Sequence, residues 1–283
     1  MCLRRRLRRL ASLAVALCLG ACAAADFNLP GASGDGPSYA AAHPYFFEYC
    51  ALSQILKKPG FGADIRGQIG GHAVFYLNGA CRVAGVAYPV LALCLPDERD
   101  GVGITMNEHF RNAKWVAVPG HDFFFDGGTL APQGVTRADY ARIQTEARRL
   151  GIYDGVTFHE DVFDDMPPGW TREAWKYEVS IGTDYATSVA RGRYCALVPV
   201  SRAQMARIVA DLNAQNAPYR AGAVFTWDLF RDNCIHLAHN ALAAIGLWAP
   251  WPVHHFLPFA MLDFPVPRNE FVNIMLRTND ALA

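Results

Sequence analysis

The chain has 283 residues, of which 52% are hydrophobic, so it is long and apolar enough to bury a core of its own. Its 26 lysines and arginines balance 26 aspartates and glutamates, and no segment beyond the N-terminus is strongly basic. This charge distribution excludes nucleic acid as an expected partner.

The N-terminal residues have the pattern of a secretory signal peptide. Five arginines lie within residues 4–9, and an apolar run extends from Leu10 to Leu19. Because this run is shorter than the roughly 20 residues that cross a bilayer, it does not predict a membrane-spanning helix. It ends in Leu-Gly-Ala-Cys at residues 19–22, which resembles the lipobox of bacterial lipoproteins. The resemblance implies cleavage before Cys22 and acylation of that cysteine, whereas a plain signal peptide would be cut near Ala23 to Ala25.

The remaining chain divides into a tether and one domain. Residues 22–37 are rich in glycine, serine and proline and predict a flexible tether after the signal peptide of residues 1–21. Residues 38–283 then form a single domain. The lipobox resemblance implies that lipid on Cys22 anchors this domain to a membrane of the bacterial cell envelope, where it faces the periplasm.

Cysteine usage predicts two disulfides and one free thiol. Apart from Cys22, the mature chain has an odd set of cysteines, and an oxidising compartment can pair four of them. We expect Cys234 to be the free one. The other four are Cys50, Cys81, Cys94 and Cys195. The sequence does not give their connectivity, although Cys81 and Cys94 are the nearest pair along the chain and the preferred one.

The first half of the domain predicts one helix and several strands. Residues 38–56 have an apolar side at helical spacing, and Pro59-Gly60 follows, so we expect a helix. Residues 68–77 alternate between two faces as in a strand, and Asn78-Gly79 is a frequent hairpin turn. Further strands are expected at residues 90–95, 101–106 and 115–118.

The second half predicts more helices. Thr136 is an N-cap for a helix that ends at Gly151, and Ser201 with Gln204 is a capping box for another. The acidic residues between 153 and 170 lack the spacing of a calcium-binding loop and indicate a solvated loop. The order of elements and the hairpin signals favour an α+β fold, with an antiparallel sheet packed against helices.

The stretch from Asp232 to Gly246 predicts a capped helix. Asp232 or Asn233 can supply the N-cap, and Gly246 is a suitable C-terminal stop. Cys234 begins the apolar face and therefore points inward from the first turn. The free N–H groups and the helix dipole there favour a thiolate, so Cys234 is a candidate nucleophile. The alternative is a cysteine that only fills the core.

A cysteine nucleophile needs a base, and His72 is the candidate because it begins a predicted strand behind Gly70-Gly71. Gly-Gly-His-Ala-Val-Phe-Tyr-Leu at residues 70–77, followed by Asn-Cys-Ile-His-Leu-Ala-His-Asn-Ala-Leu at residues 233–242, resembles circularly permuted papain-like thiol enzymes. This group is related to NlpC-type cell-wall peptidases and lecithin:retinol acyltransferases. The resemblance implies a permuted papain-like α+β fold, with Cys234 as nucleophile and His72 as general base.

The third catalytic position is open. By the same resemblance, a polar residue on the strand after the histidine strand should orient the imidazole, but residues 90–95 offer none. The candidates to replace it are Asn78, His109 and His121.

Neither a metal nor a cofactor is expected. On a helix, Cys234 and His236 lie about 200° apart, so these two cannot easily share one ion with His239. A metal-dependent hydrolase would instead need three or more histidine or aspartate side chains that converge.

The sequence thus predicts an envelope lipoprotein that uses a Cys–His pair to cleave or transfer an acyl group through a thioester. Compartment and resemblance together point to peptidoglycan as the substrate, with another amide or ester as the alternative. The other function kept open is a non-catalytic lipoprotein that uses the same fold for binding or envelope structure. That function predicts a Cys234 that is disulfide-bonded, or buried without a histidine nearby.

Overall fold

The computed structural model describes residues 36–54, 71–95, 101–128, 136–189, 191–253 and 266–278, all within the compact unit Gly31–Ala283. The signal peptide, Cys22 and most of the tether lie outside these residues, so the predictions made for them stay predictions. Within the described ranges, no helix is long and apolar enough to span a membrane.

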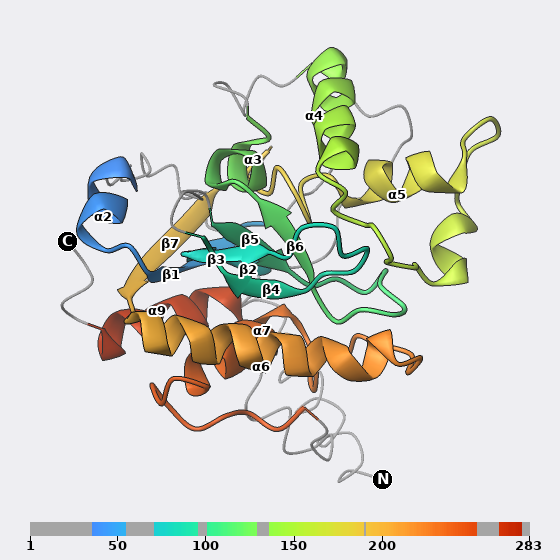
Figure 1. Cartoon of the computed structure of the whole chain (residues 1–283). Coiled ribbons are helices and arrows are strands. Elements are labelled where there is room, and N and C mark those ends of the chain that lie inside the picture. The colour runs from blue at the N-terminus through green and yellow to red at the C-terminus, as the bar shows by residue number, and fades with distance from the viewer. Residues whose placement is uncertain are drawn as a thin grey trace, which may run out of the picture. The chain divides into compact units, whose positions relative to one another are not determined.

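The core is a five-stranded antiparallel sheet (Figure 1). Its strands, in spatial order, are β6 (Val116–Pro119), β5 (Val102–Thr105), β2 (His72–Asn78), β1 (Phe46–Leu52) and β7 (Arg193–Pro199). Every neighbouring pair runs antiparallel. The predicted α+β class with an antiparallel sheet is confirmed.

Helices cover both faces of the sheet. In Figure 1, α6 (Arg202–Arg220), α7 (Cys234–Ala243) and α9 (Pro267–Arg277) lie on one side, and α3 (His121–Asp126) lies on the other. Four further helical segments are α2 (Gly36–Ala42), α4 (Arg137–Arg149), α5 (Arg172–Ser180) and the short 3-10 helix η2 (Glu160–Phe163).

Side-chain alternation assigns strand residues to these two faces. The Tyr49 hydroxyl donates to the Pro267 carbonyl at 2.9 Å, so Tyr49 faces α9. His72 pairs directly with Leu52, which lies an odd number of residues from Tyr49. Because alternate residues point to opposite faces and directly paired residues share one, His72 points to the other face, toward α3.

Two disulfides are present, Cys50–Cys195 and Cys81–Cys94. The first joins directly paired positions of β1 and β7. Cys234 is the free cysteine among the described residues. The predicted division of the mature cysteines and the preferred pairing of Cys81 with Cys94 are therefore confirmed.

The helix predicted for residues 38–56 is wrong. A short helix, α2, ends at Ala42, and the chain then enters β1. Every residue of β1 is buried, because β2 and β7 flank this strand and helices cover both faces of the sheet. A strand that is buried on both faces shows no polar alternation, so its apolar residues can also fit a helical spacing.

The strand predicted at residues 90–95 exists in a shorter form, but it is not the neighbour of β2. It is β4 (Leu91–Leu93), which pairs with β3 (Ala80–Arg82) in a separate two-stranded sheet. The sheet neighbour of β2 is β5. The strand that can supply a residue to orient His72 is therefore β5.

Candidate functional site

Asn233 is the N-cap of α7. Its Oδ1 accepts hydrogen bonds from the backbone N–H groups of Ile235 at 2.9 Å and His236 at 3.3 Å. Its Nδ2 donates to the carbonyl of Leu229 at 2.6 Å. Of the two predicted N-cap residues, Asn233 has the role, and Cys234 follows as the first residue of the helix.

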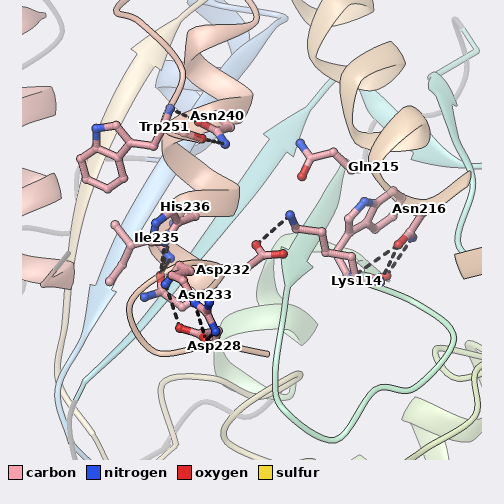
Figure 2. Close-up of polar contacts among 12 residues, drawn as sticks. Lys114, Gln215, Asn216, Asp228, Asp232, Asn233, Ile235, His236, Asn240 and Trp251 are labelled. Carbon is pink, nitrogen blue, oxygen red and sulfur yellow. Dashed lines mark hydrogen bonds and ion pairs between the residues drawn. The ribbon is translucent and has the colours of Figure 1, made fainter. Parts of the chain in front are cut away.

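Charged side chains hold the loop that precedes α7. The carboxylate of Asp228 accepts two backbone hydrogen bonds from the turn that follows it, both at 3.0 Å. Asp232 forms an ion pair with Lys114, with 2.8 Å between Oδ1 and Nζ, and both side chains are at most 7% exposed. Figure 2 shows this pair beside Asn216, whose Oδ1 accepts from the Lys114 backbone N–H at 2.7 Å. The start of α7 is therefore fixed to the chain before β6 and to α6.

The Cys234 thiol is buried, with 8% of the residue exposed. Burial raises the pKa of Cys234 to about 11. Smaller opposing contributions come from the backbone N–H groups of Ala73, Cys234 and Ile235 and from the charge of Arg191. The N–H groups at the helix start favour the thiolate as expected, but burial outweighs them, and the thiol is protonated at neutral pH.

His72 is buried at the start of β2 and is bonded to Thr105 at the end of β5. Its Nε2 lies 3.0 Å from Thr105 Oγ1. Because Thr105 Oγ1 donates to the Thr183 carbonyl at 3.3 Å, it accepts from the N–H of His72. In a neutral ring, this arrangement favours the tautomer with the proton on Nε2. Thr105 is thus the residue that orients His72, and the sequence prediction missed it.

A second buried network fixes the backbone on which Thr105 depends. The carboxylate of Asp184, next to Thr183, accepts from Asn107 Nδ2 at 2.7 and 2.8 Å. The same carboxylate accepts from the Tyr153 hydroxyl at 2.8 Å. Asn107 lies two residues after Thr105, the last residue of β5, and Asp184 directly follows Thr183, so both partners of the contact between Thr105 and Thr183 are held in place.

The three predicted candidates for the third position have other surroundings. Asn78 lies at the opposite end of β2 from His72 and donates to a backbone carbonyl at 2.8 Å. His109 packs against a phenylalanine ring, with the centroids 5.9 Å apart. His121 of α3 lies 2.8 Å from the carboxylate of Glu48. Burial alone would lower the pKa of His121, but the hydrogen bond and charge of Glu48 raise it overall.

Cys234 and His72 lie at the same end of the sheet. The Cys234 sulfur interacts with the backbone N–H of Ala73, the residue that follows His72. Helix α7 lies on the face toward which Ala73 points, whereas the His72 side chain points toward α3. The two groups therefore approach the end of β2 from opposite faces, and their catalytic coupling stays a prediction.

Protein-family models, curated proteins and solved structures provide no match to this chain. The chemistry of the site rests on its own residues.

The other two histidines of α7 have structural partners. His236 Nδ1 lies 3.1 Å from the side-chain oxygen of the N-cap residue. His239 is stacked between Trp248 and Trp251, with ring centroids 4.4 and 3.8 Å away. Its Nδ1 lies 2.9 Å from a carboxylate oxygen of the buried Glu270 in α9. His239 therefore joins α7 to α9 and to the segment that follows α7.

Among the described residues, Glu48, Cys50 and Cys195 bring three potential metal ligands within 4.8 Å of one another. The two sulfur atoms form a disulfide with each other. Because zinc binds cysteine as a thiolate, this group is not a metal site while that disulfide is intact.

Proposed function

We propose that this chain is a lipid-anchored protein of the bacterial cell envelope whose permuted papain-like domain is a Cys–His thiol hydrolase or acyltransferase. The observation that carries the proposal is the environment of Cys234. It is a free cysteine at the start of a helix, where three backbone N–H groups and one arginine favour its thiolate and burial opposes it. Such a thiol ionises when a base accepts its proton, and His72 is adjacent in sequence to one of the N–H donors.

In the proposed first step, Nδ1 of His72 accepts the thiol proton while Sγ of Cys234 attacks the carbonyl carbon of an amide or ester. The negative charge moves to the carbonyl oxygen. Because Asn233 already accepts from the N–H groups of Ile235 and His236, the N–H of Cys234 is the donor that this turn offers to the oxyanion. The intermediate then collapses, the C–N or C–O bond breaks, and the leaving amine or alcohol takes the proton from His72.

The resulting thioester is resolved in a second step. Water or an amine attacks its carbonyl carbon, His72 accepts a proton from that nucleophile, and the proton then returns to the Cys234 sulfur as the C–S bond breaks. Water gives hydrolysis and an amine gives acyl transfer. The proposed substrates are the peptide cross-links of peptidoglycan, a choice that follows from the expected compartment and the family resemblance, with another amide or ester as the alternative.

The test is the release of peptide products from purified peptidoglycan, and of the alcohol from a set of simple acyl esters, by the protein without its signal peptide. Cys234→Ala and His72→Ala should each abolish the activity on whichever substrate the wild type cleaves. His43→Ala, which changes a histidine just beyond α2 and outside the site, should keep it. A Cys234→Ala variant as active as the wild type would contradict the proposal.

A non-catalytic envelope lipoprotein is the second candidate. Two observations favour it: the high pKa of the buried Cys234, and the orientation of the His72 side chain toward the face opposite α7. It predicts that the reactivity of the Cys234 thiol is the same with and without His72.

A further inference from the structure

Arg191 lies at the same end of the sheet as Cys234 and His72. The residue that follows it, Gly192, pairs with Ser53, since the Ser53 N–H donates to the Gly192 carbonyl at 2.9 Å and the Gly192 N–H donates to Ser53 Oγ at 3.0 Å. Ser53 directly follows the residue of β1 that pairs with His72. Arg191 is only 7% exposed, so a full positive charge is buried at this end of the sheet.

The guanidinium of Arg191 lacks the partners that a buried arginine normally has. Its Nε and Nη1 atoms are buried and, among the described residues, meet no hydrogen-bond acceptor. Arg193, two residues along the chain, is different, because its guanidinium pairs with Asp126 at 3.3 Å and with the Ser188 hydroxyl at 3.0 Å. Burial of an arginine without acceptors is unfavourable, so native structures normally pair such groups.

The titratable group whose ionised form would stabilise the Arg191 cation is Cys234. Burial lowers the pKa of Arg191 to about 10, which still leaves it a cation at neutral pH, and among the described residues the opposing contribution comes from a Cys234 thiolate. That thiolate is absent at neutral pH, because burial raises the pKa of Cys234 to about 11. The site therefore holds a buried cation, with unused donors, next to a neutral thiol.

We infer that Arg191 and the Cys234 thiol together form an anion-recognition site, in which Arg191 binds a carboxylate that the acyl substrate carries close to its scissile bond. That the bound anion is part of an acyl substrate rests on the proposed function. The binding of an anion at Arg191 does not depend on it. A carboxylate supplies the acceptors that Nε and Nη1 lack and can bind a guanidinium through two parallel hydrogen bonds. A peptide whose cleaved bond is adjacent to a free carboxylate has this chemistry.

The experiment compares two alkylating reagents of similar size. Iodoacetate carries a carboxylate and iodoacetamide carries a neutral amide. In both reactions the Cys234 sulfur forms a bond to carbon, iodide leaves, and the thiol proton passes to solvent. The rate ratio, iodoacetate over iodoacetamide, is measured at Cys234 by mass spectrometry and divided by the same ratio for free N-acetylcysteine.

We expect this normalised ratio to be about ten in the wild type, because a pair of charge-assisted hydrogen bonds increases affinity by at least about tenfold. Arg191→Gln should bring it close to one, and Arg191→Lys should give an intermediate value. Arg193→Gln is the matched control, since it removes an equal charge that already has partners, and should leave the ratio unchanged.

Two results would overturn the inference: a normalised ratio near one in the wild type, or a Cys234 that neither reagent reaches in the folded protein. If Arg191→Gln does not fold, the inference is tested in the wild type by competition with acetate. At constant ionic strength, acetate should slow iodoacetamide at Cys234, and no slowing refutes the site. His72→Ala separates this inference from the proposed function, because loss of the base changes both rates together and leaves their ratio intact.

Discussion

Replacement of Thr105 by valine should destabilise the domain and release the imidazole of His72. Valine has nearly the shape of threonine but lacks the hydroxyl that accepts from His72 Nε2 and donates to the Thr183 carbonyl. Thr105, His72 and Thr183 are all at most 6% exposed, so water cannot readily replace these bonds. A buried donor left without its acceptor costs about 1–3 kcal/mol. Each kcal/mol lowers Tm by about 2–4 °C in a domain of this size class.

Two assays test this expectation. Urea unfolding gives the loss of stability, and ¹⁵N NMR of the histidine side chains gives the tautomer of His72. In the wild type at neutral pH, we expect the proton on Nε2. In Thr105→Val we expect a larger share of the other tautomer, because the hydroxyl that accepts from Nε2–H is gone. Thr105→Ser keeps the hydroxyl and is the matched control for the methyl group. If Thr105→Val has the stability and the single His72 tautomer of the wild type, the orienting role of Thr105 is refuted.

Three other predictions concern the elements around the site. Lys114→Met leaves the buried Asp232 without its counter-ion and should lower the free energy of unfolding in urea by about 3–5 kcal/mol. The double variant Lys114→Met with Asp232→Leu should recover much of this loss, and equal losses in the two variants would contradict the ion pair. Glu270→Gln replaces the charge-assisted bond to His239 by a neutral one and should cost about 1 kcal/mol, and an unchanged midpoint would refute that contact. Mass spectrometry of the mature N-terminus should find an acylated Cys22, and an unmodified start beyond it would rule out the lipid anchor.

The α7 region could be predicted in detail because its signals are local. Its N-cap is a choice between two adjacent residues, and the structure assigns it to Asn233. Capping boxes also start α4 at Thr136 and α6 at Ser201, as expected from side chains that bond to backbone three residues away. Local hydrogen-bonding chemistry of this kind is readable from a single sequence.

The errors arose where distant parts of the chain decide the outcome. The sequence predicts a helix over β1 because both faces of this strand are buried by elements far along the chain, which leaves no polar alternation to read. Thr105 was missed because β5, and not β4, is the neighbour of β2, and strand order is a property of the whole sheet. Alternation then puts Thr105 on the face of His72, a relation that becomes readable once that order is known.

The burial of a side chain likewise cannot be predicted from the local sequence. The dipole argument for a lowered Cys234 pKa is correct in sign, since the N–H groups at the start of α7 do favour the thiolate. Desolvation is larger, however, and it depends on how completely the sheet and the neighbouring helices cover the sulfur. Arg191 carries no sequence motif at all, and only its buried position identifies it.

The most direct test of the Cys–His pair is the pH profile of iodoacetamide alkylation at Cys234, in the wild type and in His72→Ala. A thiol with a pKa of about 11 and no base reacts about tenfold faster for each pH unit up to that value. If His72 accepts the thiol proton, a small population of imidazolium and thiolate has the same total number of protons as the neutral pair. The fraction of protein in this imidazolium–thiolate form is then independent of pH between the pKa of the histidine and the pKa of the thiol.

The account therefore predicts a plateau in the wild-type rate, beginning near the ordinary histidine pKa of about 6.5 and extending toward the rise at high pH. His72→Ala should lose the plateau and keep the rise that ends at about pH 11, so that its alkylation needs a higher pH. His43→Ala should retain the wild-type profile. Superimposable profiles for the wild type and a folded His72→Ala protein would show that Cys234 and His72 are not coupled, and would contradict the central claim.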